Sequence, residues 1–394
     1  MAALTNSKLA GPISGANLET PALSARLHPG KKGCPMTLRA FVDILSEHGE
    51  LKRIRQLVDW KIELGEITRS HRQPLLFENI KDYPGMRVLT NGLSNASSVA
   101  IAFGLLPENG RKRTIAEIRR RVAAPLKPIV VSDGPVMENV IEGTDLNLFD
   151  FPIPQWSKYD AGRYIGTWHA NVTRDPETGR RNLGVYRMQV LGRTQTTVST
   201  STKSHLSRHF AKAEKEGRPL EMAVVIGAAE PVVMAAGSGC SLDLDEYDLA
   251  CSLCGEAIPL VRCGTVNLEV PAESEIVLEG IIQPGARVQD GPYLDYAGEP
   301  AANPNAYVFN VTRVMFRNRP ILRGAAVGHS AAEDQQLFSI LAELDLFDFH
   351  GSRTRHWVQT KLIKRQSFRL FQAIGKTHPP AFLRRAAKHL GLVH

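Results

Sequence analysis

The sequence predicts an α+β protein in which a small N-terminal α/β unit precedes a strand-rich core and a helical C-terminal segment. Three observations predict this class. Helical and strand-like patterns alternate over residues 36–125, short strand-like runs separated by turn residues dominate 126–330, and helical patterns return over 331–394. The strand-rich part is typical of a barrel or a sandwich. Residues 1–35, rich in Ala, Ser, Gly and Pro, are expected to be a disordered leader or sequence upstream of a start at Met36.

The composition is that of an ordinary globular protein. The chain has 394 residues, of which 43% are hydrophobic and 22% charged. No run approaches the roughly 20 apolar residues that a membrane span needs. The five cysteines are few and irregularly spaced, unlike those of a secreted disulfide scaffold. A reducing, cytoplasmic compartment is therefore expected.

The net charge of +8 is unevenly distributed along the chain. Residues 351–394 contain ten Lys and Arg and no Asp or Glu, which leaves the rest of the chain with a charge of −2. The basic character belongs to this tail, so the net charge does not indicate that the whole protein binds nucleic acid. Nucleic acid is not expected as a partner.

Local signals predict the elements of the N-terminal unit. Thr37 is a candidate N-cap for a helix that buries Leu38, Phe41, Val42 and Leu45 and ends near Gly49. The run "LKRIRQLVDW" is strand-like, and "IELGEITRSH" is helical. Further along, "TIAE" places Thr114 and Glu117 at the spacing of a capping box, which predicts a helix from there to about Val122.

Short runs of apolar and β-branched residues predict the strands of the core, and two helical patterns interrupt them at about 205–216 and 246–254. A further helix is predicted over "AEDQQLFSILAELDLF". The strand-like runs are "KPIVVS", "WHANVTR", "LGVYRMQVLG", "TTVSTST", "MAVVIGA", "PVVMAA", "IPLVRCGTVNLEV", "EIVLEGIIQP", "YVFNVTRVMF" and "ILRGAAV".

Three motifs have a structural explanation as well as a functional one. Cys251 and Cys254 form a C-x-x-C, but the same stretch is an amphipathic helix in which both are small core residues. His205 and His209 have the spacing of a metal-binding pair, which exposed helix histidines share. The "GSG" turn at 237–239 is of a kind that can cradle a phosphate, and alone it is a weak signal.

Arg187 and two acids form a more specific set. If "LGVYRMQVLG" is a strand, Arg187 lies among core residues, where a buried cation requires a partner. The stretch "DGPYLDYAG" offers Asp290 and Asp295 on either side of a Gly-Pro sequence. In one straight strand these acids, five positions apart, would point to opposite faces. We therefore expect a turn to bring them together around Arg187.

On these residues the chain resembles a known family. The stretches "TRDPETGRRNLGVYRMQV" and "EVPAESEIVLEGIIQPGARVQDGPYLDYAGE" resemble those of UbiD-type decarboxylases, and the similarity runs in the family's order from about Thr37 to Gly328. The resemblance implies reversible, non-oxidative decarboxylation of an aromatic or α,β-unsaturated (acrylic) acid through an adduct with prenylated FMN. It implies a split β-barrel core like that of flavin reductases. It also implies a homo-oligomer that receives its cofactor from a flavin prenyltransferase.

The resemblance assigns a metal and cofactor site. Asn182, His205 and Glu246 fall on the family's ligands for Mn²⁺, with Mg²⁺ as an alternative, and K⁺ often lies nearby in the family. Amide oxygen, imidazole and carboxylate ligands suit such ions. Cofactor contacts fall on Asn182, Arg187, Ser204, His205 and Ser238.

The resemblance also assigns the chemistry to Arg187, Asp290 and Asp295. Arg187 is expected to hold the substrate carboxylate, Asp290 to hold Arg187, and Asp295 to protonate the carbon that loses CO₂. The family's leading Glu is here Asp290, shorter by about 1.5 Å, and a family Gly is here Leu294. A looser arginine–carboxylate pair or a reshaped substrate cavity is therefore expected.

Two other functions remain open from the sequence. The chain is alternatively a flavin-free subunit of a larger carboxylase, or a binding module that acts through its basic tail on an anionic membrane or nucleic acid. Family members usually continue into a further α/β domain, so the lid, the oligomer and one side of the cofactor pocket are in question. The amphipathic stretch 357–374 fits a cap over the barrel. Weak, salt-sensitive association with a membrane surface is hypothesised beside that role.

Overall fold

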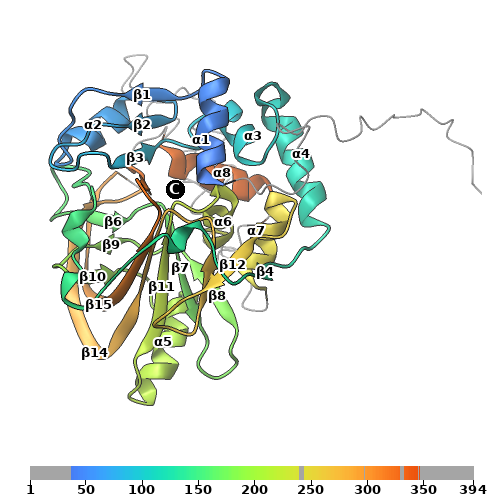
Figure 1. Ribbon diagram of the computed structural model, residues 1–394. Helices are drawn as coiled ribbons and strands as arrows, with labels where there is room; N and C mark the ends of the chain where they lie inside the picture. Colours follow the sequence, from blue (N-terminus) through green and yellow to red (C-terminus); the bar gives the residue numbers. More distant parts are fainter. Residues whose placement is uncertain (1–36, 239–243, 297, 329–331, 345, 347–394) are drawn as a thin grey trace, which may run out of the picture.

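A computed structural model describes residues 37–238, 244–296, 298–328, 332–344 and 346. The predictions made for residues 1–35 and for the basic tail, 351–394, lie outside these residues. Figure 1 shows the N-terminal helices and strands, in blue, above a strand-rich core in which the longest strands run from top to bottom. The fold is a mixed α+β fold with a curled sheet, and no helix in the described ranges is long and apolar enough to cross a membrane.

The N-terminal unit is built on a small sheet that takes its last strand from the far end of the core. The strand order is β1-β2-β3-β16, and β16 pairs in parallel with β3. The strands are β1 (Lys52–Ile54), β2 (Leu75–Phe77), β3 (Arg87–Thr90) and β16 (Ile321–Arg323). The helices of this unit are α1 (Leu38–Glu47), α2 (Glu63–Ser70), α3 (Ala96–Ala102) and α4 (Gly110–Val122). The core is therefore joined to this unit at both ends of its sequence.

The N-termini of α1 and α4 test two predictions about N-capping residues. The first is confirmed: the Thr37 hydroxyl accepts a hydrogen bond from the Ala40 N–H at 3.1 Å, and the apolar face of α1 is buried. The second is wrong, because α4 begins at Gly110 and Thr114 lies inside the helix, where its hydroxyl donates to the Gly110 carbonyl. A capping box needs an extended residue at its first position, and helical residues already precede Thr114. The end of α4 at Val122 agrees with the prediction.

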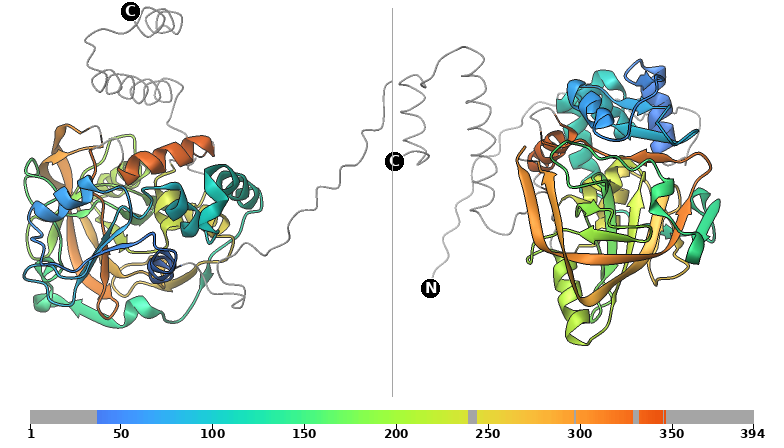
Figure 2. Two further views of the ribbon diagram at one scale, coloured as in Figure 1. Left: turned by 90° about the horizontal axis from the view of Figure 1, so that it is seen from above. Right: turned by 90° about the vertical axis from the view of Figure 1, so that its left-hand side faces the viewer.

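The core sheet, as far as the structure describes it, has seven strands in the order β10-β15-β14-β11-β7-β8, with β5 paired to β15. Its strands are β5 (Asn139–Glu142), β7 (His169–Arg174), β8 (Arg181–Gly184), β10 (Gln195–Val198), β11 (Leu220–Ile226), β14 (Ile276–Leu294) and β15 (Pro300–Phe316). The right-hand view of Figure 2 shows the long orange strands, β14 and β15, curling around the rest of the core. This curl places the far end of β14 beside the short strands β9 and β10.

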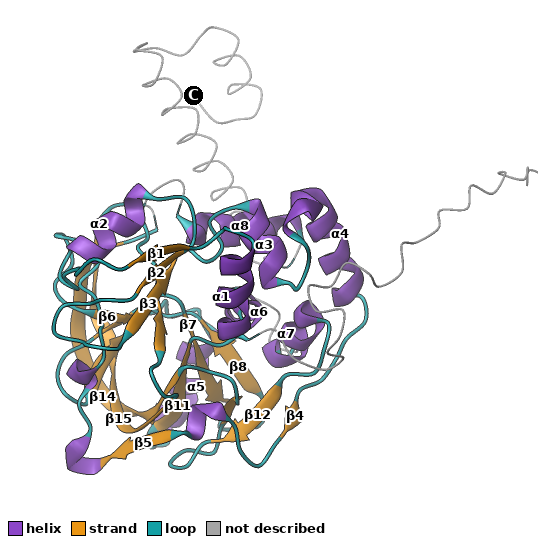
Figure 3. Cartoon of the chain, turned by 45° about the horizontal axis from the view of Figure 1, so that its top comes forward, coloured by secondary structure: helices purple, strands orange, loops and turns teal. Residues whose placement is uncertain are grey.

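Smaller elements complete the core. Two further sheets are β13-β12-β4 and β6-β9. Their strands are β4 (Ile129–Val130), β6 (Tyr164–Gly166), β9 (Met188–Gln189), β12 (Pro259–Arg262) and β13 (Glu269–Pro271). The helices are α5 (His205–Lys215), α6 (Glu230–Ala236), α7 (Glu246–Cys254) and α8 (Glu333–Glu343), with 3-10 turns at Pro107–Asn109, Pro135–Met137, Gly143–Asp145 and Leu148–Asp150. Figure 3 shows α1, α3, α4, α6, α7 and α8 gathered on one side of the strands.

Two strand predictions are wrong. The run "PVVMAA" lies in helix α6, which is buried along its whole length, so it carries the continuous apolar pattern of a buried strand. The run "LGVYRMQVLG" is not one strand, because β8 ends at Gly184 and β9 begins at Met188. Arg187 therefore lies in a connection, held by an isolated bridge to Ser199. The predicted helices at 205–216, 246–254 and from 332 onward are present as α5, α7 and α8.

A buried group of charges ties α8 to the sheet of the N-terminal unit. Arg323 in β16 is 1% exposed, and its Nε donates to Glu230 of α6 at 2.8 Å. The same guanidinium forms an ion pair with Glu333 at the start of α8, and Glu333 also accepts the Asn91 N–H at 2.9 Å. Trp168 donates to the second oxygen of Glu230 at 2.7 Å. One arginine thus pairs with two buried acids from separate elements.

Replacing this arginine is expected to destabilise the fold strongly. Arg323→Met leaves Glu230 and Glu333 buried without their cation, which is expected to lower the free energy of unfolding by about 3–5 kcal/mol. Urea denaturation measures the change. Arg55→Met is the control, because Arg55 also pairs with an acid but its side chain is 78% exposed, and little change is expected. Equal stability of the two variants would contradict the role of the buried group.

Candidate active site

Arg187 and Asp290 form a buried ion pair at the curled end of the core sheet. The Nε of Arg187 donates to Oδ1 of Asp290 at 2.5 Å, and the Thr197 hydroxyl donates to Oδ2 at 2.7 Å. Asp290 is fully buried, whereas the Arg187 side chain is 18% exposed. The predicted contact is therefore present. The shorter acid reaches the arginine directly, through one of its two oxygens.

The guanidinium of Arg187 is held on one edge only. Its Nη2 donates to the Ala301 carbonyl at 3.2 Å, and its carbon lies 5.4 Å from the centre of the Tyr293 ring. Within the described parts of the chain, Nη1 makes no hydrogen bond. A partly exposed guanidinium with one edge fixed presents its other donors to an anion.

A β-bulge, and not a turn, sets the relative direction of the two acids. Asp290 pairs with Asn303 and Tyr293 with Ala301, so β14 advances three residues while β15 advances two. The extra residue at Gly291–Pro292 reverses the alternation of side chains, which returns Tyr293 to the face of Asp290. Asp295, two residues further, is expected on the same face. The predicted Gly-Pro turn is thus corrected to a bulge within a strand.

Asp295 begins the hairpin that connects β14 to β15. Its N–H donates to the Glu299 carbonyl at 3.0 Å, and its Oδ1 accepts the Glu299 N–H at 3.3 Å. Among the described residues, the ion pair of Arg187 is with Asp290, so Asp295 does not flank the arginine within salt-bridge distance. Its role as a proton donor remains a prediction.

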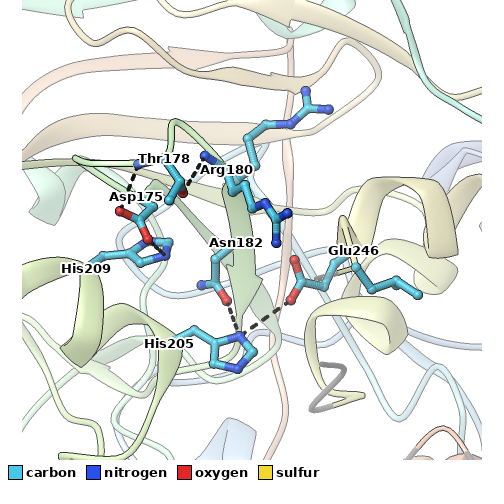
Figure 4. A pocket seen from close by; sticks show the side chains of 9 residues that line it. Asp175, Thr178, Arg180, Asn182, His205, His209 and Glu246 are labelled. Atoms are coloured by element: carbon cyan, nitrogen blue, oxygen red, sulfur yellow. Dashed lines mark hydrogen bonds and ion pairs between the residues drawn. The ribbon is translucent and has the colours of Figure 1, made fainter. Parts of the chain in front are cut away.

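Three predicted ligand residues meet in a separate pocket of about 220 Å³. Figure 4 shows Asn182 from β8, His205 from α5 and Glu246 from α7 pointing toward one another. His205 Nδ1 lies 3.0 Å from Oδ1 of Asn182 and 3.9 Å from Oε1 of Glu246. All three residues are buried, at 3%, 9% and 3% exposure for Asn182, His205 and Glu246. Three elements far apart in sequence thus direct three donor atoms to one point.

An ion pair beside these residues aligns the segments that carry them. Arg181 donates to Asp245 at 2.7 and 3.0 Å, and these are the chain neighbours of Asn182 and Glu246. Asp245 is also the N-cap of α7, where it accepts the Tyr247 N–H. Oε2 of Glu246 accepts the Leu183 N–H at 3.0 Å. The sequence did not single out Arg181 or Asp245, because nothing in either local stretch indicates the partner.

The donor set of Asn182, His205 and Glu246 fits a hard divalent cation. His205 Nδ1 donates a hydrogen bond to Oδ1 of Asn182 at 3.0 Å. Two ligand atoms bonded at about 2.1 Å and at right angles to one cation would lie about 3 Å apart, so a cation could take the place of this proton with little movement. Burial raises the pKa of Glu246 to about 8, so a cation beside this carboxyl would offset its loss of hydration. No group of three or more His, Cys, Asp or Glu residues suited to a metal occurs in the described ranges. The set described above is not such a group, because its third member, Asn182, offers an amide oxygen.

His209 lines the other side of the same pocket. Its Nδ1 lies 3.0 Å from the Thr173 hydroxyl, and its Nε2 lies 3.9 Å from Asp175, which pairs with Lys212. Burial lowers the pKa of His209 to about 4. The two histidines predicted as a metal-binding pair therefore have different surroundings. His205 faces the amide and carboxylate donors, whereas His209 packs as a neutral side chain.

The remaining predicted cofactor contacts lie at helix ends. Ser204 is the N-cap of α5 and accepts the Ser207 N–H at 3.1 Å. Ser238 is fully buried just after α6, and its hydroxyl donates to the Ala235 carbonyl. The C-x-x-C residues Cys251 and Cys254 lie in α7 as free thiols, and burial raises the pKa of Cys251 to about 11. They agree with the structural explanation of that motif.

Comparison with known proteins was made for the sequence and for the fold. The family model of the 3-octaprenyl-4-hydroxybenzoate carboxy-lyase Rift-related domain, UbiD, matches residues 129–330, and its N-terminal domain, UbiD_N, matches 42–122. Pyrrole-2-carboxylic acid decarboxylase of Pseudomonas aeruginosa is 32% identical over 79% of this chain and 66% of its own length. The chain spans 56% to 66% of the length of this and four other similar curated proteins.

Solved structures agree with the sequence comparison. The UbiD-class enzyme HmfF of Pelotomaculum thermopropionicum, in an evolved dimeric form in complex with prFMN, has a TM-score of 0.72 and 33% identity, covering 78% of this chain and 71% of that chain. Vanillic acid decarboxylase of Sedimentibacter hydroxybenzoicus, in closed form, has a TM-score of 0.75 and 29% identity, covering 79% and 68%. The similarity therefore includes both the N-terminal unit and the core.

The buried, neutral state of His209 predicts a pH dependence of stability. The pKa of His209 is about 4 in the folded protein, and in the unfolded chain it is about 6.5. The unfolded state therefore binds more protons between these values, so stability is lost as the pH falls from 6.5 toward 4. His209→Gln keeps a neutral polar side chain and should remove about 2 kcal/mol of the loss measured between pH 7 and pH 5. Urea denaturation at both pH values tests this, and an unchanged loss would contradict it.

Proposed function

The chain belongs to the UbiD family, and on this premise we propose that it catalyses the reversible, non-oxidative decarboxylation of an aromatic or α,β-unsaturated carboxylic acid with prenylated FMN. The observation that carries the proposal is the guanidinium of Arg187. Buried Asp290 and the Ala301 carbonyl hold one edge of it, and the side chain stays partly exposed. A carboxylate is the anion that an arginine recognises best through two parallel hydrogen bonds.

Arg187 and Asp290 bind and orient the substrate, and Asp295 transfers a proton. When bound, prenylated FMN supplies the electron sink that an sp² carbon needs in order to lose CO₂. Arg187 orients the carboxylate that will leave, and Asp290 fixes the arginine so that no reorganisation is needed. Asp295 supplies the proton to the carbon and regains it from solvent when the product leaves. The bulge supports this division, because it returns Tyr293 to the face of Asp290, and Asp295 is expected on the same face two residues further along.

Asn182, His205 and Glu246 would hold Mn²⁺ or Mg²⁺ against the cofactor's phosphate. Their convergence in one pocket and their oxygen and imidazole donors support this assignment. Ser204 and Ser238 would contact the cofactor from the ends of α5 and α6, and K⁺ would bind nearby. The curled sheet supports the more specific description of the core as a split β-barrel.

The names of relatives support the substrate class. Relatives are called pyrrole-2-carboxylic acid decarboxylase and phenolic acid decarboxylase, and both names describe acids built on an unsaturated ring. A flavin prenyltransferase would supply the cofactor, and a homo-oligomer in the cytoplasm would be the working form. The weak membrane association proposed for the basic tail lies outside the described residues.

A visible absorption spectrum separates this function from the two rivals. The protein is purified after co-expression with a flavin prenyltransferase and is incubated with a panel of aromatic and acrylic acids. A flavin-like spectrum and release of CO₂ support the decarboxylase. A colourless, inactive protein would favour the flavin-free subunit, and salt-sensitive retention on anionic vesicles would favour a binding module.

Removal of Arg187 is expected to abolish turnover and, because it leaves buried Asp290 without its cation, to lower the melting temperature as well. Arg187→Ala removes the cation that orients the carboxylate, and a rate loss of roughly 100-fold or more is expected. The initial rate of CO₂ release and the melting temperature are measured together. Arg317→Ala is the control, because Arg317 is 13% exposed and pairs with Glu273 away from the site. Near-normal turnover by Arg187→Ala would contradict the proposed site.

Loss of a ligand side chain is expected to lower metal content before it affects the fold. Glu246→Gln keeps the size of the side chain and removes its charge, and His205→Ala removes the imidazole. Each is expected to reduce bound manganese about 10-fold or more after dialysis, as measured by elemental analysis. His209→Gln, in the same pocket, should retain the metal. Full manganese in both ligand variants would show that the assignment is wrong.

A further inference from the structure

The bulged segment, residues 290–295, is held by bonds from outside its own sheet. The extra residue of a bulge interrupts the ladder to β15, so backbone groups of the segment need other partners. The Gly291 N–H donates to Oε1 of Gln189 at 2.9 Å, and the Pro292 carbonyl accepts the Ala161 N–H at 2.7 Å. The Leu294 N–H donates to Oδ1 of Asp160 at 2.9 Å. These bonds define the position of the strand where it carries the two acids.

Asp160 is the charged member of this set. It lies in the connection that leads into β6 and is 5% exposed. Its Oδ2 accepts the Ser157 N–H at 2.8 Å while Oδ1 accepts the Leu294 N–H. One carboxylate therefore joins its own loop to the bulged segment. Burial raises the pKa of Asp160 to about 6, so both oxygens are acceptors at neutral pH.

The two acids of the site are held by different partners. Asp290 is fixed through its side chain, by Arg187 and Thr197. Asp295 bonds to Glu299 across the hairpin, and the residue before it is fixed through its backbone by Asp160, which ties this end of the hairpin to the rest of the core. The loop of Asp160 makes no hydrogen bond to Arg187 or Asp290 within the described residues. Loss of Asp160 would therefore move one acid and leave the other in place.

We propose that Asp160 is a positioning residue that sets the place of Asp295 relative to the carboxylate held by Arg187. This inference rests on the proposed function, and it concerns the proton-transfer half of the site. A displacement of about 1 Å in a reacting group can cost on the order of 100-fold in rate. Substrate affinity should change little, because Arg187 and Asp290 keep their contacts.

The sequence contains no local signal for this role. Asp160 lies in "SKYDAG", which has the composition of an ordinary surface loop. Its target is 134 residues further along the chain. The association follows from the fold, which brings the connection before β6 against the end of β14.

The test uses cofactor-loaded full-length protein and two variants. Asp160→Ala removes both acceptors and should lower kcat about 100-fold with KM changed less than threefold. Asp160→Asn keeps one acceptor and should lower kcat by about 10-fold. Hydrogen–deuterium exchange should become faster in a peptide that covers 291–296 and stay unchanged over 276–282.

A buried acid elsewhere in β14 provides the matched control. Glu279 is fully buried and accepts the N–H groups of Gly264 and Thr265, so Glu279→Gln also weakens bonds from a loop to the strand. It should leave kcat unchanged even if the melting temperature falls. Wild-type kcat in both Asp160 variants, a rise in KM that accounts for the loss, or unchanged exchange at 291–296 would overturn the inference. Absence of turnover in the wild-type protein would instead contradict the proposed function, whatever the exchange shows.

Discussion

The buried carboxylate of Asp290 is the constraint on which the arrangement of the site depends. A fully buried carboxylate needs a cation and hydrogen-bond donors, because desolvation of an unpaired charge is too unfavourable for a folded chain. Arg187 and Thr197 meet this need from two other segments, the connection between β8 and β9 and the strand β10. The pair fixes where the curled end of β14 meets the short strands. It also fixes the guanidinium in the orientation that the proposed chemistry uses.

The pocket lined by Asn182, His205 and Glu246 and the arginine site share one piece of chain. Asn182 and Arg187 lie at either end of a short stretch that leaves β8, crosses without regular structure and enters β9. Its first end is held by the pair of Arg181 with Asp245, and its last end by Asp290. Because the strand breaks between them, the direction of each end is set by these ion pairs and not by the alternation of one strand. A continuous strand, as first predicted, would have fixed their directions by alternation alone.

The candidate residues of this region lie in or beside irregular backbone. Arg187 is in the connection between β8 and β9, and Asp290 adjoins the bulge in β14. The bulge at Gly291–Pro292 changes which residues of β14 share a face. Backbone groups that the bulge leaves without a partner in β15 form hydrogen bonds with Gln189, Ala161 and Asp160. The regular parts of the fold serve as support. The buried pairing of Arg323 with Glu230 and Glu333, for example, joins α6 and α8 to the sheet of the N-terminal unit and, within the described residues, contacts neither Arg187 nor the residues that line the pocket of Asn182.

The sequence by itself determined the elements whose signals are local. The N-cap at Thr37, the helices that begin at His205 and Glu246, and the parts of β14 and β15 that lie in "EIVLEGIIQP" and "YVFNVTRVMF" follow from caps, periodicity and β-branched runs, which act over a few residues. The extension of both strands toward residues 294 and 300 was not predicted. The stretches around Arg187 and Asp290 also identified the family, and with it the candidate residues. The resemblance already assigned Asp290 as the partner of Arg187. Only the tertiary structure decided that Asp295 does not share this contact in the described part of the chain, where the strand breaks, and which residues hold the bulged segment. Those outcomes depend on contacts between residues far apart in sequence, such as Asp160 with Leu294, and on a one-residue bulge whose register no local pattern records.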